Sequence, residues 1–286
     1  MAHPRSADNT DVPDLSVVIP MYNEQDRIGR TLDDALSWLR EQPFSSEVVL
    51  VDDGSTDRTR EVVAPLLTDA GANEKPVVRL VSYGQNRGKG AAVVEGLRAA
   101  RSEQTLMMDA DNAASVREVL KLFRAMGDGV GLVAGSREAP DADVEAIATR
   151  RLTGALFRTA LGLLGLNLIR DTQCGFKLYS RAAVDTVVEH AREPGFVFDL
   201  EHLALTRMAG LSVVERGIRW RHVDGSKVSP IADGLKMLSR AAKLRTRLGS
   251  LHRQRSNDPR AIEIKATPDP AATSGLGRES TVTSQV

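Results

Sequence analysis

The sequence has one cysteine, few aromatic residues and no net charge. Cys174 stands alone among 286 residues, which excludes an intrachain disulfide and a metal site built from several thiolates. A chain without disulfides is typical of a reducing compartment. Aromatic residues make up 4% of the chain, so Leu, Val, Ile and Ala must supply the core. Lys plus Arg and Asp plus Glu number 38 each, which argues against a nucleic-acid-binding protein that works through bulk positive charge.

Long hydrophobic runs are also scarce. Residues 1–14 are polar, so we expect no signal peptide there. The most apolar stretch, 152–169, is about long enough to cross a bilayer, but it contains Arg158, Asn167 and several glycines. The pattern favours an amphipathic helix that lies on a membrane surface over one that spans it.

Short apolar runs alternate with helical spacing in the first half of the chain. The runs 15–19, 48–51, 77–81, 105–108 and 131–134 predict strands. Apolar residues recur at helical spacing in 28–39, 62–67, 91–100 and 116–126, and Ser115 with Glu118 forms a capping-box pattern before the last of these. This alternation predicts an α/β fold with a mostly parallel sheet flanked by helices. Ligands bind outside the carboxyl ends of such strands, so the residues after each run are candidates for chemistry.

The second half is less regular. We expect helices over 149–166, 182–189 and 200–208, and two paired strands over 211–214 and 218–220. A basic amphipathic helix starts at Pro230 and reaches about Leu251. After Ser256 the composition shifts to Pro, Ser, Thr and Gly, which predicts disorder. The predicted organisation is a disordered segment 1–12, one α/β domain over 13–228, an amphipathic helix over 229–255 and a disordered tail over 256–286.

Carboxylates and a tyrosine follow the first two predicted strands. After Pro20, Tyr22 offers a flat face to a nucleobase and Glu24 offers a carboxylate to ribose or base donors; a turn with a helix cap is the alternative. Asp52 and Asp53 directly follow the second strand. Adjacent carboxylates at a buried strand end are costly unless a group such as a base N–H or a metal pairs with them. A solvated turn is the alternative there.

Glycines follow the third predicted strand. Gly88-x-Gly90 resembles a dinucleotide-binding loop, but Val93 holds the place of the third glycine and the loop starts too far from the strand. A nicotinamide-dependent oxidoreductase is therefore disfavoured. The start of a helix at this point could bind an anion such as a phosphate. A tight turn into the helix, with no ligand, explains the glycines equally well.

Two carboxylates and an arginine follow the fourth and fifth strands. Asp109 and Asp111 alternate along a turn, where both can face one divalent cation. Mg²⁺ or Mn²⁺ is commonly held by one or two carboxylates together with substrate phosphates. Arg137 follows the fifth strand, and its fork of donors suits a phosphate in the same crevice. These residues predict a metal-assisted site whose leaving group is a diphosphate.

The order of these motifs resembles that of family 2 glycosyltransferases with a GT-A fold. Within the family, the resemblance is greatest to the polyprenyl-phosphate branch, namely dolichyl-phosphate β-glucosyltransferase with dolichol-phosphate mannose synthase as a near relative. It covers roughly residues 13–250, and segment 171–177 is typical of that branch. The matching segments are 20–24, 52–57, 109–111, 135–137, 171–177 and 225–227.

The resemblance implies a role for each matching residue. The positions that hold the nucleoside are Pro20, Tyr22, Glu24, Val51 and Asp53. The turn that holds the metal, Mg²⁺ or Mn²⁺, and the donor diphosphate is Asp109, Ala110 and Asp111, with Asp109 and Asp111 as the metal ligands. The other members of the implied donor-binding and catalytic set are Arg137, Arg221 and Lys227, the last two closing over the diphosphate. A basic residue near the lipid phosphate is Arg150 or Arg151.

Two departures bear on the branch. Mannose synthases carry a metal-binding Gln two residues beyond the second Asp, and here that position is Ala113, which favours the glucosyl branch and leaves the third metal ligand unassigned. We also expect no transmembrane anchor of the kind found in many relatives. The resemblance implies inverting transfer of a hexose, from UDP-glucose in preference to GDP-mannose, to a polyprenyl phosphate. That acceptor implies a peripheral protein on the cytoplasmic face of a membrane, in an unassigned oligomeric state.

Other functions remain open. A nucleotidyltransferase that makes nucleotide sugars would need a glycine-rich loop after the first strand, where this chain has Pro20 to Glu24. A non-catalytic nucleotide-sugar sensor could lose the second carboxylate of the turn, yet Asp111 is present. Asp199 and Glu201 either orient the acceptor or the arginines, or are acids at a helix start.

Overall fold

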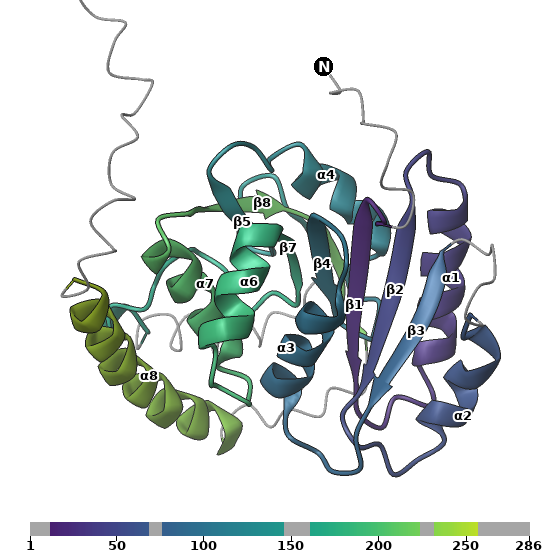
Figure 1. Cartoon of the computed structure of the whole chain (residues 1–286), viewed down its shortest axis with the longest axis horizontal. Coiled ribbons are helices and arrows are strands. Elements are labelled where there is room, and N and C mark those ends of the chain that lie inside the picture. The colour runs from purple at the N-terminus through teal and green to yellow at the C-terminus, as the bar shows by residue number, and fades with distance from the viewer. Residues whose placement is uncertain (1–11, 69–75, 146–160, 224–231, 257–286) are drawn as a thin grey trace, which may run out of the picture. The chain divides into compact units, whose positions relative to one another are not determined.

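The computed structural model describes residues 12–68, 76–145, 161–223 and 232–256 (Figure 1). Arg150, Arg151 and Lys227 lie outside the described residues, as do the predicted disordered ends apart from residues 12 and 256, and most of the predicted helix 149–166. The described residues up to Thr246 belong to one compact unit, and those from Arg247 on belong to a second.

A seven-stranded sheet forms the centre of the first unit, in the order β3-β2-β1-β4-β7-β5-β8 (Figure 1). β1 pairs in parallel with β2 and β4, β2 with β3, and β5 with β8, whereas β7 runs antiparallel between β4 and β5. The prediction of a mostly parallel sheet is therefore confirmed. The strand bounds are Leu15–Met21 (β1), Ser46–Asp52 (β2), Val77–Ser82 (β3), Gln104–Met108 (β4), Val130–Ser136 (β5), Phe176–Ser180 (β7) and Ser212–Gly217 (β8).

Helices cover both faces of this sheet, which is why its strands are apolar on both sides. Val17 of β1 belongs to the same core cluster as Ile28 and Leu32 of α1, whereas Val18 belongs to a second cluster with Ala92 of α3. The helix bounds are Ile28–Arg40 (α1), Thr59–Val63 (α2), Lys89–Ala99 (α3), Val119–Phe123 (α4), Arg181–His190 (α6), Phe198–Met208 (α7) and Ala232–Ser256 (α8), with short 3₁₀ turns at Ala64–Leu66 (η1) and Val116–Glu118 (η2). No helix in the described part of the chain is both long and apolar enough to cross a bilayer.

Two local predictions were wrong. The segments 211–214 and 218–220 do not pair with each other: β8 extends the sheet beside β5, and β9 (Arg219–Arg221) pairs in parallel with β6 (Asp143–Glu145). β5 offers β8 a longer pairing partner than segment 218–220 would. The backbone N–H of Ile218, the residue after β8, also donates to Ser136 O at 3.2 Å.

The capping box at the start of the fourth helical segment is also absent. Ser115 Oγ donates to Asp34 (2.9 Å) instead of capping, and Glu118 Oε2 accepts the backbone N–H of Arg219 (2.9 Å). The predicted helix 116–126 is correspondingly a 3₁₀ turn followed by the short α4.

Candidate active site

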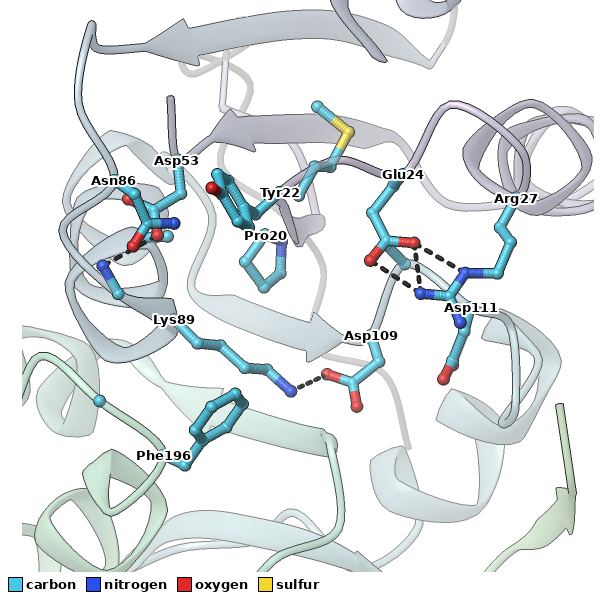
Figure 2. Close-up of a pocket in the computed structure, with 15 residues that line it drawn as sticks. Pro20, Tyr22, Glu24, Arg27, Asp53, Asn86, Lys89, Asp109, Asp111 and Phe196 are labelled. Atoms are coloured by element: carbon cyan, nitrogen blue, oxygen red, sulfur yellow. Dashed lines mark hydrogen bonds and ion pairs between the residues drawn. The ribbon is translucent and has the colours of Figure 1, made fainter. Parts of the chain in front are cut away.

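A cleft of about 440 Å³ opens at the carboxyl ends of β1, β2 and β4 (Figure 2). The sheet order explains it, because β1 lies between β2 and β4 and the loops after these three strands meet at one edge. The predicted site residues that line the cleft are Pro20, Tyr22, Glu24, Asp53, Asp109, Ala110 and Asp111.

The loops after β1 and β2 are joined by Asn23, which adopts a left-handed backbone (φ 55°). Its backbone N–H donates to Ser55 Oγ (2.9 Å), and its side-chain oxygen accepts the N–H of Thr56 (2.8 Å). The next residue, Glu24, donates its N–H to Thr59 Oγ1 (2.7 Å). The loop after β2 thus fixes the backbone that presents the neighbouring side chains to the cleft.

Those neighbours have different surroundings. Tyr22 is 38% exposed and lines the cleft, so part of its side chain is accessible to a ligand. The carboxylate of Glu24 is bound to the guanidinium of Arg27, with Nε to Oε2 at 2.8 Å. A donor that engages Glu24 would therefore meet a carboxylate already paired with a cation.

The two adjacent aspartates find partners within the chain. Asp52, fully buried, forms an ion pair with Arg60 at 2.7 Å. Asp53 accepts the backbone N–H groups of Arg87 (2.7 Å) and Gly88 (2.9 Å). Partners within the chain therefore offset the free-energy cost of burying these two carboxylates, and no ligand is required for this. A carboxylate has about four acceptor positions, so Asp53 keeps capacity toward the cleft that it lines.

The turn after β4 carries the predicted metal ligands. Lys89 Nζ, from the first residue of α3, lies 2.6 Å from Asp109 Oδ1 (Figure 2). Asp111 Oδ1 accepts the backbone N–H of Ala113 at 3.0 Å. Burial and the charge of Asp109 raise the pKa of Asp111 above its usual value. A further cation at Asp111 would favour its charged form.

Side chains of α1 hold this turn in place. Buried Thr31 donates its hydroxyl to the backbone oxygen of Ala110 at 2.7 Å. Asp34, one helical turn later, accepts from the side chains of Asn112 (3.2 Å) and Ser115 (2.9 Å). Two consecutive turns of one helix therefore set the shape of the segment that contains both carboxylates.

The donor set fits a hard divalent cation. Asp109 and Asp111 supply oxygen ligands, the kind that Mg²⁺ and Mn²⁺ prefer. Within the described residues, no group of three His, Cys, Asp or Glu side chains is placed to hold a metal. Ala113, where a third ligand was sought, is 8% exposed and offers only a methyl group. Two carboxylates together with water and substrate phosphates are a common ligand set for such a cation.

Arg137 does not line the cleft. Its guanidinium forms a bidentate pair with Asp171, with Nε to Oδ2 at 2.7 Å and Nη2 to Oδ1 at 2.8 Å, and it lies 5.6 Å from the ring centre of Trp220. Burial opposes the charged form of Asp171, but Arg137 more than offsets this and lowers the pKa of that carboxyl. The pair uses two of five guanidinium N–H groups.

Two other predicted residues also lie outside the lining. Val51 is fully buried in the cluster beneath α3, with Val18. Arg221 lies on β9, where its guanidinium pairs with Glu145 and its backbone N–H donates to Ala113 O at 2.8 Å. β9 therefore runs beside the end of the turn that carries Asp111.

Sequence reasoning assigned no role to several residues of the cleft. Arg27, Asn86 and Phe196 line it, as does Lys89. Lys89 had a signal, because it begins a helix between two glycines after a strand. Phe196 had none, because its place depends on how the loop between α6 and α7 packs against the start of α3.

The two acids left open at the start of α7 are both buried and bound. Asp199 Oδ1 lies 2.6 Å from Nζ of Lys177, which is also fully buried. Glu201 Oε2 accepts the backbone N–H groups of Arg192 (2.9 Å) and Glu193 (2.8 Å). Glu201 thus shapes the loop before α7, and Asp199 compensates a buried lysine.

Comparison with known proteins adds independent information. Residues 16–188 match the family model for Glycosyl transferase family 2. The chain is 36% identical over 239 residues to the dolichyl-phosphate beta-glucosyltransferase of Saccharomyces cerevisiae, covering 78% of this chain and 71% of the relative. It is 35% identical over 238 residues to the human protein of that name, covering 78% and 72%.

A solved structure with a similar fold is glucosyl-3-phosphoglycerate synthase from Mycobacterium tuberculosis in complex with Mn²⁺, UDP-glucose and phosphoglyceric acid. The TM-score is 0.61 at 23% sequence identity, and the match covers 83% of this chain and 80% of that one. At this level of identity, the similarity concerns the fold alone.

Proposed function

Because the chain belongs to glycosyl transferase family 2 and has its α/β GT-A fold, we propose that it transfers glucose from UDP-glucose to the phosphate of a polyprenyl lipid of the dolichyl type. The observation that carries the proposal is the meeting of Tyr22 and Asp53 with Asp109 and Asp111 in one cleft. The yeast and human relatives named for this reaction support the choice of sugar and acceptor.

The nucleoside end of the donor would bind between the loops after β1 and β2. The exposed ring of Tyr22 offers a face for the base, and Asp53 offers a carboxylate oxygen to a base N–H. Because two backbone N–H groups already fix Asp53, little side-chain entropy is lost when a base binds it.

The diphosphate would lie at the turn after β4. Arg27 and Lys89 approach this turn from opposite sides of the cleft and provide positive charge for the leaving group (Figure 2). Asp109 and Asp111 would hold Mg²⁺ or Mn²⁺, which, when bound, neutralises charge on the departing diphosphate. The family resemblance adds Arg137, Arg221 and Lys227 to the donor-binding set, of which Arg137 and Arg221 do not line the cleft and Lys227 lies outside the described residues.

The acceptor needs no general base in this scheme. The second pKa of a phosphate monoester is near ~6, so at neutral pH the acceptor is largely a dianion and already a nucleophile. The protein must position it and exclude water. We place Arg150 or Arg151 near the lipid phosphate. A single in-line displacement inverts the anomeric carbon and gives a β-linked sugar phosphate.

The acceptor remains in a bilayer, so the site must approach a membrane surface. Between Lys227 and Arg255 the sequence has eight basic residues against Asp233 alone. On α8, Lys243 and Arg245 are exposed, whereas Ala241 and Leu244 are buried. Part of the apolar side of α8 is thus covered by protein, and the proposed peripheral binding to the cytoplasmic leaflet rests on the exposed charges.

A panel of donors and acceptors tests the proposal. UDP-glucose, UDP-galactose and GDP-mannose are each supplied with a short polyprenyl phosphate or with 3-phosphoglycerate, and products are separated by solvent extraction. We expect UDP-glucose with the prenyl acceptor to react fastest. Use of GDP-mannose with UDP-glucose ignored would contradict the sugar, and reaction with 3-phosphoglycerate alone would contradict the acceptor.

A further inference from the structure

Phe196 is an aromatic side chain at the edge of a cleft that is otherwise rich in charge. It is 41% exposed and belongs to the cleft lining together with the neighbouring Gly195. Its ring lies beside the side chain of Lys89, whose ammonium reaches Asp109 (Figure 2). Because the ring lines the cleft and is partly exposed there, a bound ligand could cover its apolar surface.

The loop that carries Phe196 is seated on the start of α3. Pro194 O accepts the backbone N–H of Gly90 at 2.8 Å. A Cβ atom on Gly90 would collide with the backbone oxygen of Glu193 and lie 2.7 Å from Cβ of Phe198. This close approach explains why glycine stands at the second position of α3.

The same loop is anchored from two other sides. Glu201, fully buried, accepts the N–H groups of Arg192 and Glu193 at 2.9 and 2.8 Å. The carboxylate of Glu193 forms an ion pair with Arg240 of α8. A loop with anchors on α3, α7 and α8 holds Phe196 in place before any ligand arrives.

The position of the ring in the cleft limits what it can bind. Tyr22 and Asp53 lie at one end of the cleft, and Phe196 lies beyond Lys89 from them (Figure 2). An aromatic face repels a diphosphate, which would lie instead near Lys89 and the cation that we assign to Asp109 and Asp111. A hexose presents C–H groups on one face and hydroxyl groups at its rim, which suits a ring bordered by charged side chains.

We propose that the ring of Phe196 packs against the C–H face of the transferred hexose, and that Glu201 is the residue that positions it. This inference rests on the proposed function. It makes Phe196 a donor-specificity residue that distinguishes a nucleotide sugar from the nucleotide alone.

The test compares the affinity of the intact protein for UDP-glucose and for UDP by calorimetry with Mn²⁺ present. Phe196→Ala should lower the affinity for UDP-glucose by about threefold to tenfold and change the affinity for UDP by less than about twofold. Phe196→Tyr, which keeps the ring, should behave like the wild type. Leu120→Ala is the matched control, because Leu120 is similarly exposed (38%) outside the cleft.

Glu201→Leu and Glu201→Gln test the positioning role. Glu201→Leu removes the acceptor and should produce the same loss for UDP-glucose relative to UDP, whereas Glu201→Gln keeps an acceptor oxygen and should restore most of the affinity. Because Glu201→Leu removes a buried group, Phe196→Ala decides the outcome if that variant does not fold. An unchanged UDP-glucose affinity in Phe196→Ala, an equal loss for UDP, or a change confined to the KM for the lipid acceptor would overturn the inference. Failure of the wild type to transfer glucose would instead count against the proposed function.

Discussion

Asp109 and Asp111 are separated by one residue but differ in how their negative charges are neutralised. Asp109 has a lysine ammonium at 2.6 Å, whereas the pKa of Asp111 is raised by burial and by the charge of Asp109. Of the two, Asp111 has more to gain from a bound cation.

We therefore predict that Asp111→Asn lowers turnover by orders of magnitude. The folded protein should be as stable as the wild type or slightly more so at neutral pH, because the substitution removes a half-buried charge whose pKa is raised. Turnover, thermal unfolding and Mn²⁺ binding followed by electron paramagnetic resonance measure these effects. Asp128→Asn, an exposed acid outside the cleft, is the control. Full activity of Asp111→Asn in excess chelator would refute the metal assignment.

His202 gives a prediction about pH. It is fully buried, its Nδ1 lies 3.0 Å from Tyr179 Oη, and burial lowers its pKa to about 3. Between the usual pKa near ~6.5 and that value, the unfolded chain binds a proton that the folded protein does not. The free energy of unfolding should therefore decrease as the pH falls from about 6.5 toward 3, with no such contribution above that range.

Urea unfolding at pH values of about 7.5 and about 5, on either side of the usual histidine pKa, measures this effect. Part of the difference in unfolding free energy between the two pH values should disappear in His202→Gln, which cannot titrate. An equal difference in wild type and variant would show that other groups cause it.

At the scale of elements, the junction of α3 with the loop before α7 depends on glycine. Gly90→Ala should destabilise the protein by about 1–3 kcal/mol through overpacking against Glu193 and Phe198, although alanine favours a helix. Gly84→Ala is the matched control, because no atom lies within 4 Å of the added Cβ. Denaturant midpoints measure both, and equal stability of the two variants would contradict the close packing of this loop on α3.

Most of the sheet could be predicted because strands covered on both faces appear as continuous apolar runs. β7 was missed as a strand because Lys177, fully buried within it, is compensated by Asp199, 22 residues later in the sequence. Local periodicity cannot reveal such a partner. The pairing of β8 with β5 was missed for a similar reason, since the choice of neighbour depends on a strand about 80 residues earlier.

The site could be predicted where it depends on strand ends. Asp53, Asp109 and Tyr22 each follow an apolar run, and parallel strands bring such residues to one edge. The bidentate pair between Arg137 and Asp171 could not be predicted. The sequence identified segment 171–177 as a motif, but it does not reveal which residue Asp171 contacts. Residues placed by loop packing, such as Phe196, had no sequence signal.

At the scale of the whole molecule, a net charge of zero conceals an exposed basic surface on α8. We predict that the protein sediments with vesicles containing anionic lipid, that high salt weakens this binding, and that truncation before Pro230 reduces it. Because Ala241 and Leu244 are buried, truncation also exposes core, so charge reversal is the cleaner test.

Lys243→Glu with Arg253→Glu should reduce vesicle binding by about tenfold or more, at about 1 kcal/mol for each basic residue near an anionic surface. Arg30→Glu with Arg40→Glu, which changes the charge equally on exposed positions of α1, should reduce it less. If the intact chain stayed in the supernatant with anionic vesicles at low salt, peripheral binding would be refuted.

We propose above that this cleft transfers glucose to a lipid phosphate with inversion. The most direct measurement supplies radiolabelled UDP-glucose, Mn²⁺ and vesicles containing dolichyl phosphate, extracts the lipid, and determines the anomeric configuration of the product by NMR. We predict lipid-soluble label in a β-linked glucosyl phosphate that Asp111→Asn does not form. Label that remains entirely in the aqueous phase, while the same preparation binds UDP-glucose, would contradict the claim.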